Sequence, residues 1–418
     1  MIKTISTIGL FLWISFFAPI AGQQYQGVFL IVVCILSSAL FISDNSARGG
    51  AFSRKDIPLW LFLLVILIGL IGVKNPPVAY SHLWLYVFPI PFLYFFTKSV
   101  FDLSRAALIL RCVCIMAASV AIYGLMEIFS GKNLIYAGLG NNPYYWLYAG
   151  SRMMSFHIHP VALGTYLAAI FPLTFVLYKI EKRRIFKSIS VFCATVILAG
   201  ALFTFSRGVL LALLAEMLII VFFLTKKKNI FYLYIVLLPL SLILINSLLR
   251  HFNYLACYRY SFTDLTNWYN YSRKLTLFLG AKEMLFDHPF FGVGLGHYRV
   301  VFDSYFPLIA DITSHEKKVA DCMYATILAE TGIVGFAAFA FFIYSILKNT
   351  LNTLRVKLKN IDLPDLNSFL LLGFFAGFAG MMCAFLTYDT LYWTAPAYLF
   401  WSFAGILAHL DQEQKRRC

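Results

Sequence analysis

The chain has 418 residues, of which 61% are hydrophobic and only 13% are charged. Soluble domains are about 45–50% apolar and about 25% charged, so this composition excludes a soluble globular protein and a disordered chain. The net charge of +15 does not indicate nucleic-acid binding, because the basic residues fall in short segments between apolar runs, as at residues 182–184 and 226–228. The chain is predicted to be an all-α polytopic membrane protein that contacts membrane lipids and no nucleic acid.

Apolar runs long enough to span the hydrocarbon core of a bilayer, about 20 residues each, occur about twelve times along the chain. They lie near residues 5–22, 27–43, 58–74, 82–97, 106–129, 160–179, 188–205, 208–224, 229–249, 323–347, 367–388 and 393–409. The first run also resembles a signal peptide, and we expect it to stay as an anchor. Basic residues gather on one side of this topology, which predicts that both termini are cytoplasmic.

The predicted organisation is asymmetric. Residues 1–249 are expected to hold nine membrane-spanning helices, residues 250–322 a long outer loop, and residues 323–418 three further helices and a cytoplasmic tail. Within the long loop, residues 271–286 carry apolar side chains at helical spacing, which predicts an amphipathic helix. Ordered outer loops on a rigid scaffold commonly carry function.

Three arginines on the outer side are candidates for binding an anion. Arg207 lies between two apolar runs with almost no loop, where a guanidinium is costly and is usually paired or functional. Arg273 begins the amphipathic loop helix, and Arg152 precedes the sixth run. The planar donor fork of arginine suits a phosphate, so the three together would make a site for a lipid diphosphate. The alternative is that each side chain reaches lipid headgroups.

Two carboxylates near the tenth run have both a structural and a functional interpretation. Asp321 is either a helix N-cap or a general base at the membrane surface, and one residue could do both. Glu330, deeper in the same run, is expected to pair with an arginine or to orient one. Asp389 is a lone carboxylate in a short outer loop, where a structural role is more common than a catalytic one.

The histidines do not predict a metal site. His157 and His159 form only a bare His-x-His, and His297 follows a run of glycines that we interpret as a tight turn rather than a nucleotide fingerprint, since no strand precedes it. No metal and no cofactor are therefore predicted. His159, His297, Tyr324 and Glu330 join Arg152 as predicted substrate-binding residues.

These motifs resemble the O-antigen ligase and polymerase superfamily of bacterial envelope glycosyltransferases. Ser206-Arg207-Gly208 is similar to the embedded arginine motif of that family, and Ser272-Arg273 followed by Pro289-Phe290-Phe291-Gly292-Val293-Gly294 is similar to its loop-helix arginine and Pro-x-x-Gly-x-Gly turn. Residues 321–335 have the spacing of the ligase motif that ends in Gly-x-x-Gly. The ligase motif begins with a histidine, whereas this chain has Asp321 there, which leaves the acceptor open.

The resemblance implies a GT-C-like fold and a function. It implies a bacterial inner-membrane enzyme, with its active face periplasmic, that moves a glycan from an undecaprenyl-diphosphate donor to an acceptor hydroxyl without nucleotide or metal. Arg207 and Arg273 would bind the diphosphate with support from Arg152, and Asp321 would accept the proton of the acceptor. The acceptor is lipid A–core for a ligase of lipopolysaccharide biosynthesis, or another glycan for an O-antigen or exopolysaccharide polymerase. Transfer to protein is a third alternative.

Two classes of transport protein remain as alternatives. A flippase for lipid-linked oligosaccharides would also have about twelve spans and buried arginines, but charged residues inside several spans would be expected. A small-solute transporter would show pseudo-symmetric halves or broken helices near the midplane. The sequence favours the transferase over both.

Overall fold

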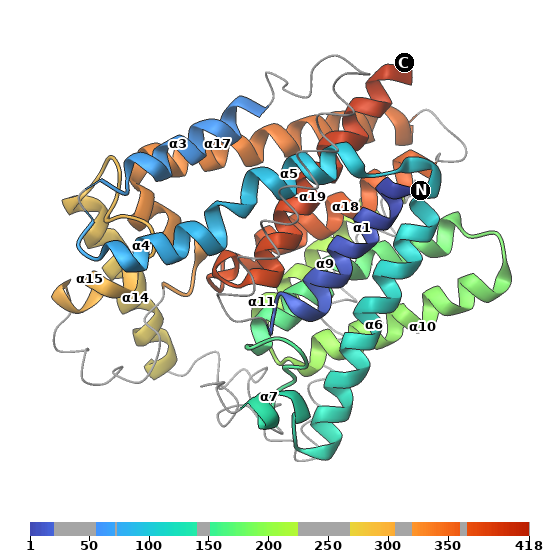
Figure 1. Cartoon of the computed structure of the whole chain (residues 1–418), viewed down its shortest axis with the longest axis horizontal. Helices are drawn as coiled ribbons and strands as arrows, with labels where there is room; N and C mark the ends of the chain where they lie inside the picture. Colours follow the sequence, from blue (N-terminus) through green and yellow to red (C-terminus); the bar gives the residue numbers. More distant parts are fainter. Residues whose placement is uncertain are drawn as a thin grey trace.

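The structure is a computed structural model that describes residues 1–20, 56–71, 73–139, 151–224, 268–305, 320–359 and 366–417. The described residues form helices and no strand, which confirms the predicted all-α class (Figure 1). In chain order the elements are α1 (Ile2–Leu12), η1 (Trp13–Phe17), α3 (Ile57–Ile68), α4 (Pro76–His82), η3 (Leu83–Val87), α5 (Pro89–Val100), η4 (Leu103–Arg105), α6 (Ala106–Ser130), α7 (Leu134–Leu139), α9 (Pro160–Ile180), α10 (Arg184–Phe203), α11 (Arg207–Leu224), α14 (Trp268–Asp287), α15 (Tyr298–Tyr305), α17 (Met323–Lys359), α18 (Leu366–Ala384), η6 (Thr390–Tyr392) and α19 (Thr394–Arg417).

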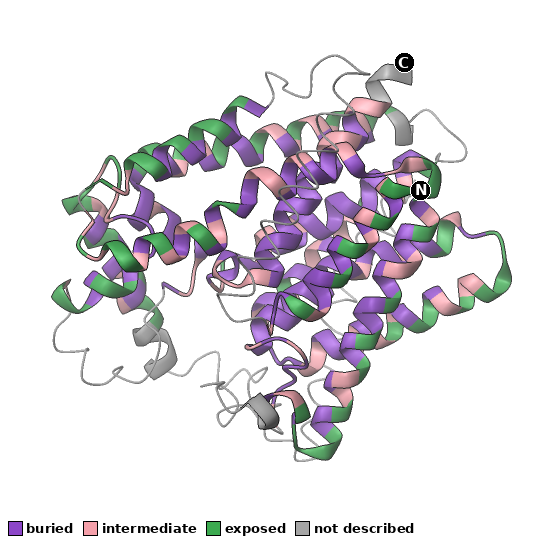
Figure 2. Ribbon diagram, viewed as in Figure 1, coloured by how far each residue is buried: buried purple, intermediate pink, exposed green. Residues whose placement is uncertain are grey.

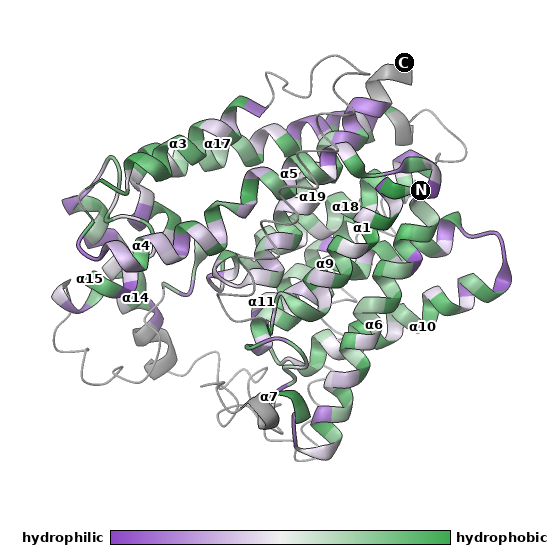
Figure 3. Ribbon diagram, in the orientation of Figure 1, coloured by the Kyte–Doolittle hydropathy of each residue, from purple (hydrophilic) through white to green (hydrophobic). Residues whose placement is uncertain are grey.

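Seven helical segments of the described chain are long and apolar enough to cross a membrane. They are Pro76–Val100, Leu103–Ser130, Pro160–Ile180, Arg184–Phe203, Arg207–Leu224, Met323–Val356 and Leu366–Ala384. Two shorter apolar helices, Ile2–Phe17 and Ile57–Ile68, coincide with the first and third expected runs, and α19 covers the twelfth. The runs expected near 27–43 and 229–249 lie outside the described residues, so a count of twelve stays a prediction. The chain is a multi-pass membrane protein, and apolar side chains dominate its long helices (Figure 3).

The centre of the bundle is α9, which is buried along almost its whole length (Figure 2). Its neighbours are α6, α10, α11, α18 and α19, and small residues let the helices approach closely. A Cβ added at Gly377 of α18 would collide with the backbone of Ala169 in α9. Close approach through small residues is the usual means of helix association where the solvent is itself apolar.

A second, smaller core lies where the long-loop helices meet the bundle. Leu277 and Ala281 of α14 and Phe302 of α15 pack against Ala325 and Ala329 at the beginning of α17. The amphipathic helix predicted over 271–286 is therefore α14, and its apolar face covers α17. It ends at Asp287, just before Pro289, where a proline is expected to follow a helix.

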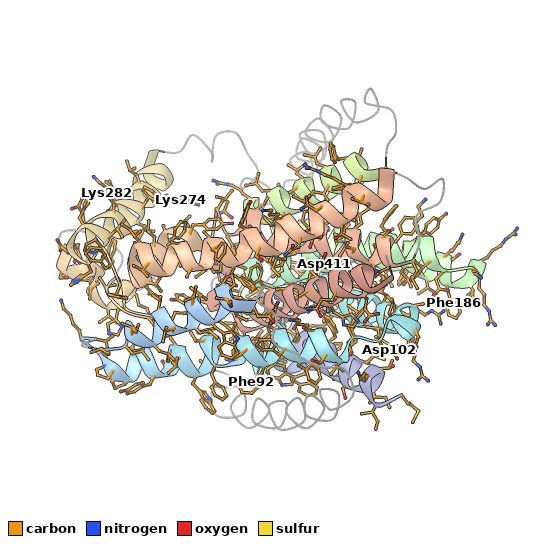
Figure 4. All side chains as sticks on the ribbon, turned by 90° about the horizontal axis from the view of Figure 1, so that it is seen from above. Phe92, Asp102, Phe186, Lys274, Lys282 and Asp411 are labelled. Atoms are coloured by element: carbon orange, nitrogen blue, oxygen red, sulfur yellow. The ribbon has the colours of Figure 1, made fainter. Side chains whose placement is uncertain are left out.

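The two ends of the molecule carry different elements. Figure 4 shows Lys274 and Lys282 of α14 at one end, whereas Phe186 and Asp102, which lie near the beginnings of α10 and α6, are toward the other. We call the first end the loop end; α4 and α15 also lie there (Figure 1).

Candidate active site

The tight turn between α10 and α11 is fixed by Arg152. The Arg152 Nε–H donates to the carbonyl of Thr204 at 2.8 Å, and the side chain is only 4% exposed. The N–H of Met153 donates to the Phe203 carbonyl at 3.1 Å, so the segment before α9 is bonded to the same turn. Arg207, half-buried, is the first residue of α11. The structure thus brings the Arg152 and Arg207 segments together.

The beginning of α11 lies against the short loop between α18 and η6. A Cβ added at Gly208 would collide with the hydroxyl of Thr387, so the glycine of the Ser-Arg-Gly motif allows this close approach. Two residues further along that loop, Asp389 Oδ2 accepts the backbone N–H of Asp321 at 3.1 Å. The Thr326 hydroxyl donates to Asp389 Oδ1. Contacts therefore run from the arginine turn through residues 387–389 to Asp321.

Backbone strain is concentrated in the predicted site segments. Among the described residues, the three non-glycine residues with positive φ are Ser155 (54°), Phe205 (48°) and Asp321 (51°). Phe205 precedes Ser206-Arg207, and a bulky residue in this region is a genuine outlier. Such residues cost about 1–3 kcal/mol each and persist where the surroundings hold them, commonly at functional sites. For Asp321, the bond to Asp389 is part of what holds the conformation.

Asp389 is more than the lone carboxylate that the sequence suggested. It is 1% exposed, and burial is the main reason that its pKa is raised to about 7. The negative charges of Asp321 and Glu330 also raise the pKa, whereas the hydrogen bonds from Thr326 and Asp321 lower it. The same three carboxylates lie within electrostatic range of Tyr298, whose pKa is raised first by burial and then by their charges. The sequence indicated only a structural role for Asp389, because its partners are more than 60 residues away along the chain.

The Pro-x-x-Gly-x-Gly turn inserts into a break in α17. The break is at Gly332, whose φ and ψ of 66° and −171° are not helical. The N–H of Ile333 donates to the Pro289 carbonyl at 2.8 Å, while the Ala329 and Glu330 carbonyls accept the N–H groups of Val293 and Gly294 at 2.9 and 3.0 Å. The turn thus satisfies backbone groups that the broken helix leaves open. The two glycine motifs of the sequence form one structural unit.

Glu330 bonds to the backbone that follows this turn. Its carboxylate accepts the backbone N–H groups of Gly296 at 2.8 Å and Tyr298 at 2.9 Å, and the hydroxyl of Tyr392. The side chain is 2% exposed. Glu330 therefore positions the loop after the glycine run. Its predicted contact with substrate stays a prediction.

The other predicted binding residues are His159, His297 and Tyr324, and each has partners in the structure. His159 caps α9 by accepting the Val161 N–H at Nδ1. Its ring stacks on those of Tyr388 and Trp393, each with a centroid 5.0 Å from that of His159. The His159 Nε2 is 3.3 Å from the Tyr388 hydroxyl. It lies beside the 387–389 loop. His297 is fully buried, with both ring nitrogens bonded to backbone. The Tyr324 hydroxyl donates to the Met382 carbonyl at 3.0 Å.

Arg273 lies in α14, and its side chain is outside the described part of the structure. The next residue, Lys274, is exposed. Burial raises the pKa of the Cys322 thiol, and the positive charge of Lys274 opposes that rise. Further along α14, Leu277 lies in the same buried cluster as Ala320 and Ala325, which lie on either side of Asp321 in the chain. Among the described residues, no group of three or more His, Cys, Asp or Glu side chains could hold a metal ion.

Comparison with models of protein families gives a match. Residues 191–340 match the family model described as O-Antigen ligase. The matched segment contains Arg207, Arg273, Asp321 and Glu330, and both glycine motifs. No curated protein matches the chain.

Proposed function

We propose that this chain, which belongs to the O-antigen ligase superfamily, is a glycan transferase that acts at the periplasmic face of the bacterial inner membrane. The donor is a glycan linked to undecaprenyl diphosphate, and the acceptor is a hydroxyl of lipid A–core. Members of this family are membrane glycosyltransferase-like enzymes with lipid-linked glycan and acceptor substrates. The proposed reaction uses neither nucleotide nor metal.

The observation that carries the proposal is the continuous set of contacts between an arginine turn and a strained carboxylate. Arg152 and Arg207 share the α10–α11 turn, that turn packs on residues 387–389, and Asp389 bonds to Asp321. The arginine turn is thus linked through one short loop to a carboxyl group on a strained backbone. Transferases that release a diphosphate need both a cation for the leaving group and a base for the incoming hydroxyl.

Each group has a defined part in the proposed step. The acceptor oxygen attacks the anomeric carbon of the donor glycan, and its proton passes to the Asp321 carboxylate. The bond between that carbon and the diphosphate oxygen breaks, and the diphosphate leaves with both electrons. Arg207 and Arg273 balance its developing charge. Arg152 positions Arg207 through the turn.

Polymerase activity is the second candidate, and one observation favours it. Asp321 stands where the ligase motif has a histidine. An acceptor that is itself a lipid-linked glycan would use the same donor site and the same base. Ligase and polymerase therefore differ only in what approaches Asp321.

An in vitro transfer assay tests both. Purified protein in lipid nanodiscs receives undecaprenyl-diphosphate glycan with EDTA present, and the acceptor is lipid A–core or a second donor molecule. Asp321→Asn is the decisive variant, because asparagine has nearly the same size and tolerates a positive φ, so the fold is retained while the base is removed. Arg207→Lys keeps the charge but loses the planar fork. We expect each to lower the rate of transfer at least a hundredfold.

The two acceptors in this assay distinguish a ligase from a polymerase. Product on lipid A–core supports the ligase, and longer chains from donor alone support the polymerase. Lys282→Gln, an exposed change in α14, serves as the control and should match the wild type. Transfer at the wild-type rate by Asp321→Asn would remove the proposed base. No transfer to either acceptor, together with movement of the donor across liposomes, would favour the flippase.

A further inference from the structure

Arg299 stands at the loop end and forms no ion pair with any carboxylate that the structure describes. It lies in the first turn of α15 and is exposed. Its Nη2 group is 3.1 Å from His82 Nε2. Its charge acts on Glu330, whose carboxylate already accepts three hydrogen bonds. The guanidinium charge is therefore available to a ligand.

His82 orients this guanidinium as a hydrogen-bond acceptor. The His82 Nδ1 lies 2.9 Å from the Val78 carbonyl, and a carbonyl only accepts, so Nδ1 carries the ring proton. Nε2 then accepts from Arg299 Nη2. The ring packs against Tyr392 and Tyr86 with centroids 5.2 and 5.6 Å away, which limits its movement. The result is an arginine whose position is fixed without neutralising its charge.

The backbone that carries Arg299 is also fixed from two sides. His297 Nε2 accepts the N–H of Asn75, which precedes α4, at 2.9 Å. Gly296 and Tyr298 donate their N–H groups to Glu330 of α17. A Cβ added at Gly296 (φ 70°) would lie 2.6 Å from the His82 ring, so the glycine permits this contact. Fixed groups of this kind lose little entropy when they bind a ligand.

The position of Arg299 relative to Arg207 decides which substrate it would meet. On the Arg207 side, Gly208 contacts Thr387, and Asp389 in the same loop bonds to Asp321. On the Arg299 side, Glu330 bonds to Tyr392, whose ring packs against His82. In this series of contacts, Asp389, Asp321 and Glu330 come between Arg207 and Arg299. In Figure 1, α15 and α4 lie at the left edge, whereas α11 is near the centre. In a direct displacement the acceptor enters opposite the leaving group, so the acceptor is expected on the Arg299 side.

We infer that Arg299, oriented by His82, binds an oxyanion carried by the acceptor glycan, either a phosphate or a sugar carboxylate. This inference rests on the proposed function and makes its acceptor more specific. The planar fork of the guanidinium matches two oxygens of such a group. Arg299 acts on binding of the acceptor, and His82 is a positioning residue.

A binding measurement tests the inference without relying on turnover. Wild type, Arg299→Gln and the control Lys282→Gln, in phosphatidylcholine nanodiscs, are titrated with glucose 6-phosphate, glucuronate and glucose by ligand-observed NMR. Arg299→Gln should weaken binding of the two anionic sugars about fivefold or more and leave glucose unchanged, while Lys282→Gln matches the wild type. His82→Phe should weaken them too, and His82→Gln, whose amide oxygen accepts the same hydrogen bond, should restore them.

Several outcomes would overturn the inference. Equal binding of the anionic sugars by wild type and Arg299→Gln removes the site. Loss of wild-type binding in nanodiscs that contain phosphatidylglycerol identifies a lipid headgroup as the occupant instead. In the transfer assay, Arg299→Gln should raise the KM for an anionic acceptor and leave the KM for the donor unchanged. If the wild type transfers nothing, the proposed function fails, and the binding titration alone decides the role of Arg299.

Discussion

The buried carboxyl group of Asp389 accepts a hydrogen bond from the backbone of Asp321, so its protonation state affects the strained backbone there. When it is ionised, its two oxygens accept the Asp321 N–H and the Thr326 hydroxyl. Asp389→Ala leaves both donors without this acceptor, and an unsatisfied buried group costs about 1–3 kcal/mol. We expect the rate of transfer to fall about tenfold to a hundredfold. Steady-state kinetics will check this, with Asp303→Asn, an exposed change in α15, as the control.

The raised pKa of Asp389 also predicts how stability depends on pH. Its folded pKa is about 7 against an ordinary value of 3.8, and burial is the main cause. Between about pH 4 and pH 7 the folded state keeps a proton that the unfolded state releases, so this group makes the protein less stable as the pH rises through that window. Asp389→Asn removes this dependence. Thermal unfolding of both proteins from pH 4.5 to 8 should show the wild type losing stability relative to the variant; a constant difference would contradict the prediction.

A substitution at Gly332 tests the break in α17 where the turn at residues 289–294 is bound. Its φ of 66° with ψ of −171° is a conformation that essentially only glycine adopts, and an added Cβ would collide with the Phe290 backbone. Gly332→Ala should therefore destabilise the protein by about 2 kcal/mol or more, which is the scale of such backbone strain. Gly9→Ala in α1 is the matched control, since open space surrounds it and a helix prefers alanine. Equal melting temperatures for the two variants would contradict the assigned break.

Glu216 is a carboxyl group that α11 buries with no hydrogen-bond partner among the residues that the structure describes. It is 0% exposed, neither oxygen has a hydrogen-bond partner, and it packs against Gly380 of α18. Because a buried polar group without a hydrogen bond costs free energy, Glu216→Met, an apolar side chain of similar length, should raise the melting temperature and leave transfer unchanged. A lower melting temperature or lost transfer would show that the carboxyl group has a functional partner.

The elements of this fold were predictable to very different degrees. The long helices and the end of α14 at Asp287 follow from local patterns, namely apolar runs, helical spacing and a nearby proline. The bond between Asp321 and Asp389 and the insertion of the 289–294 turn at Gly332 join residues far apart in the chain, so no local pattern indicates them. Glu330 shows the same limit: the sequence indicated a buried acid, but not that backbone N–H groups would be its partners.

Across the whole molecule, the orientation in the membrane decides whether the proposed substrates can reach the site. The basic residues at 182–184 lie near the beginning of α10 and the Arg152–Arg207 turn near its end, and α14 lies at the loop end (Figure 4). Basic segments favour the cytoplasm, so the loop end should face the periplasm. This follows from charge distribution and helix direction alone.

Labelling of two matched lysine positions tests the orientation. Lys182 and Lys282 are both exposed, one beside the beginning of α10 and the other in α14. In a background without native cysteines, Lys282→Cys should react with a membrane-impermeant maleimide in cells whose outer membrane is permeable to it, and Lys182→Cys should react only after the inner membrane is lysed. The reverse pattern would place the arginine turn on the cytoplasmic side. The donor glycan would then have to be used before it crosses the membrane, which would overturn the periplasmic reaction and leave the fold intact.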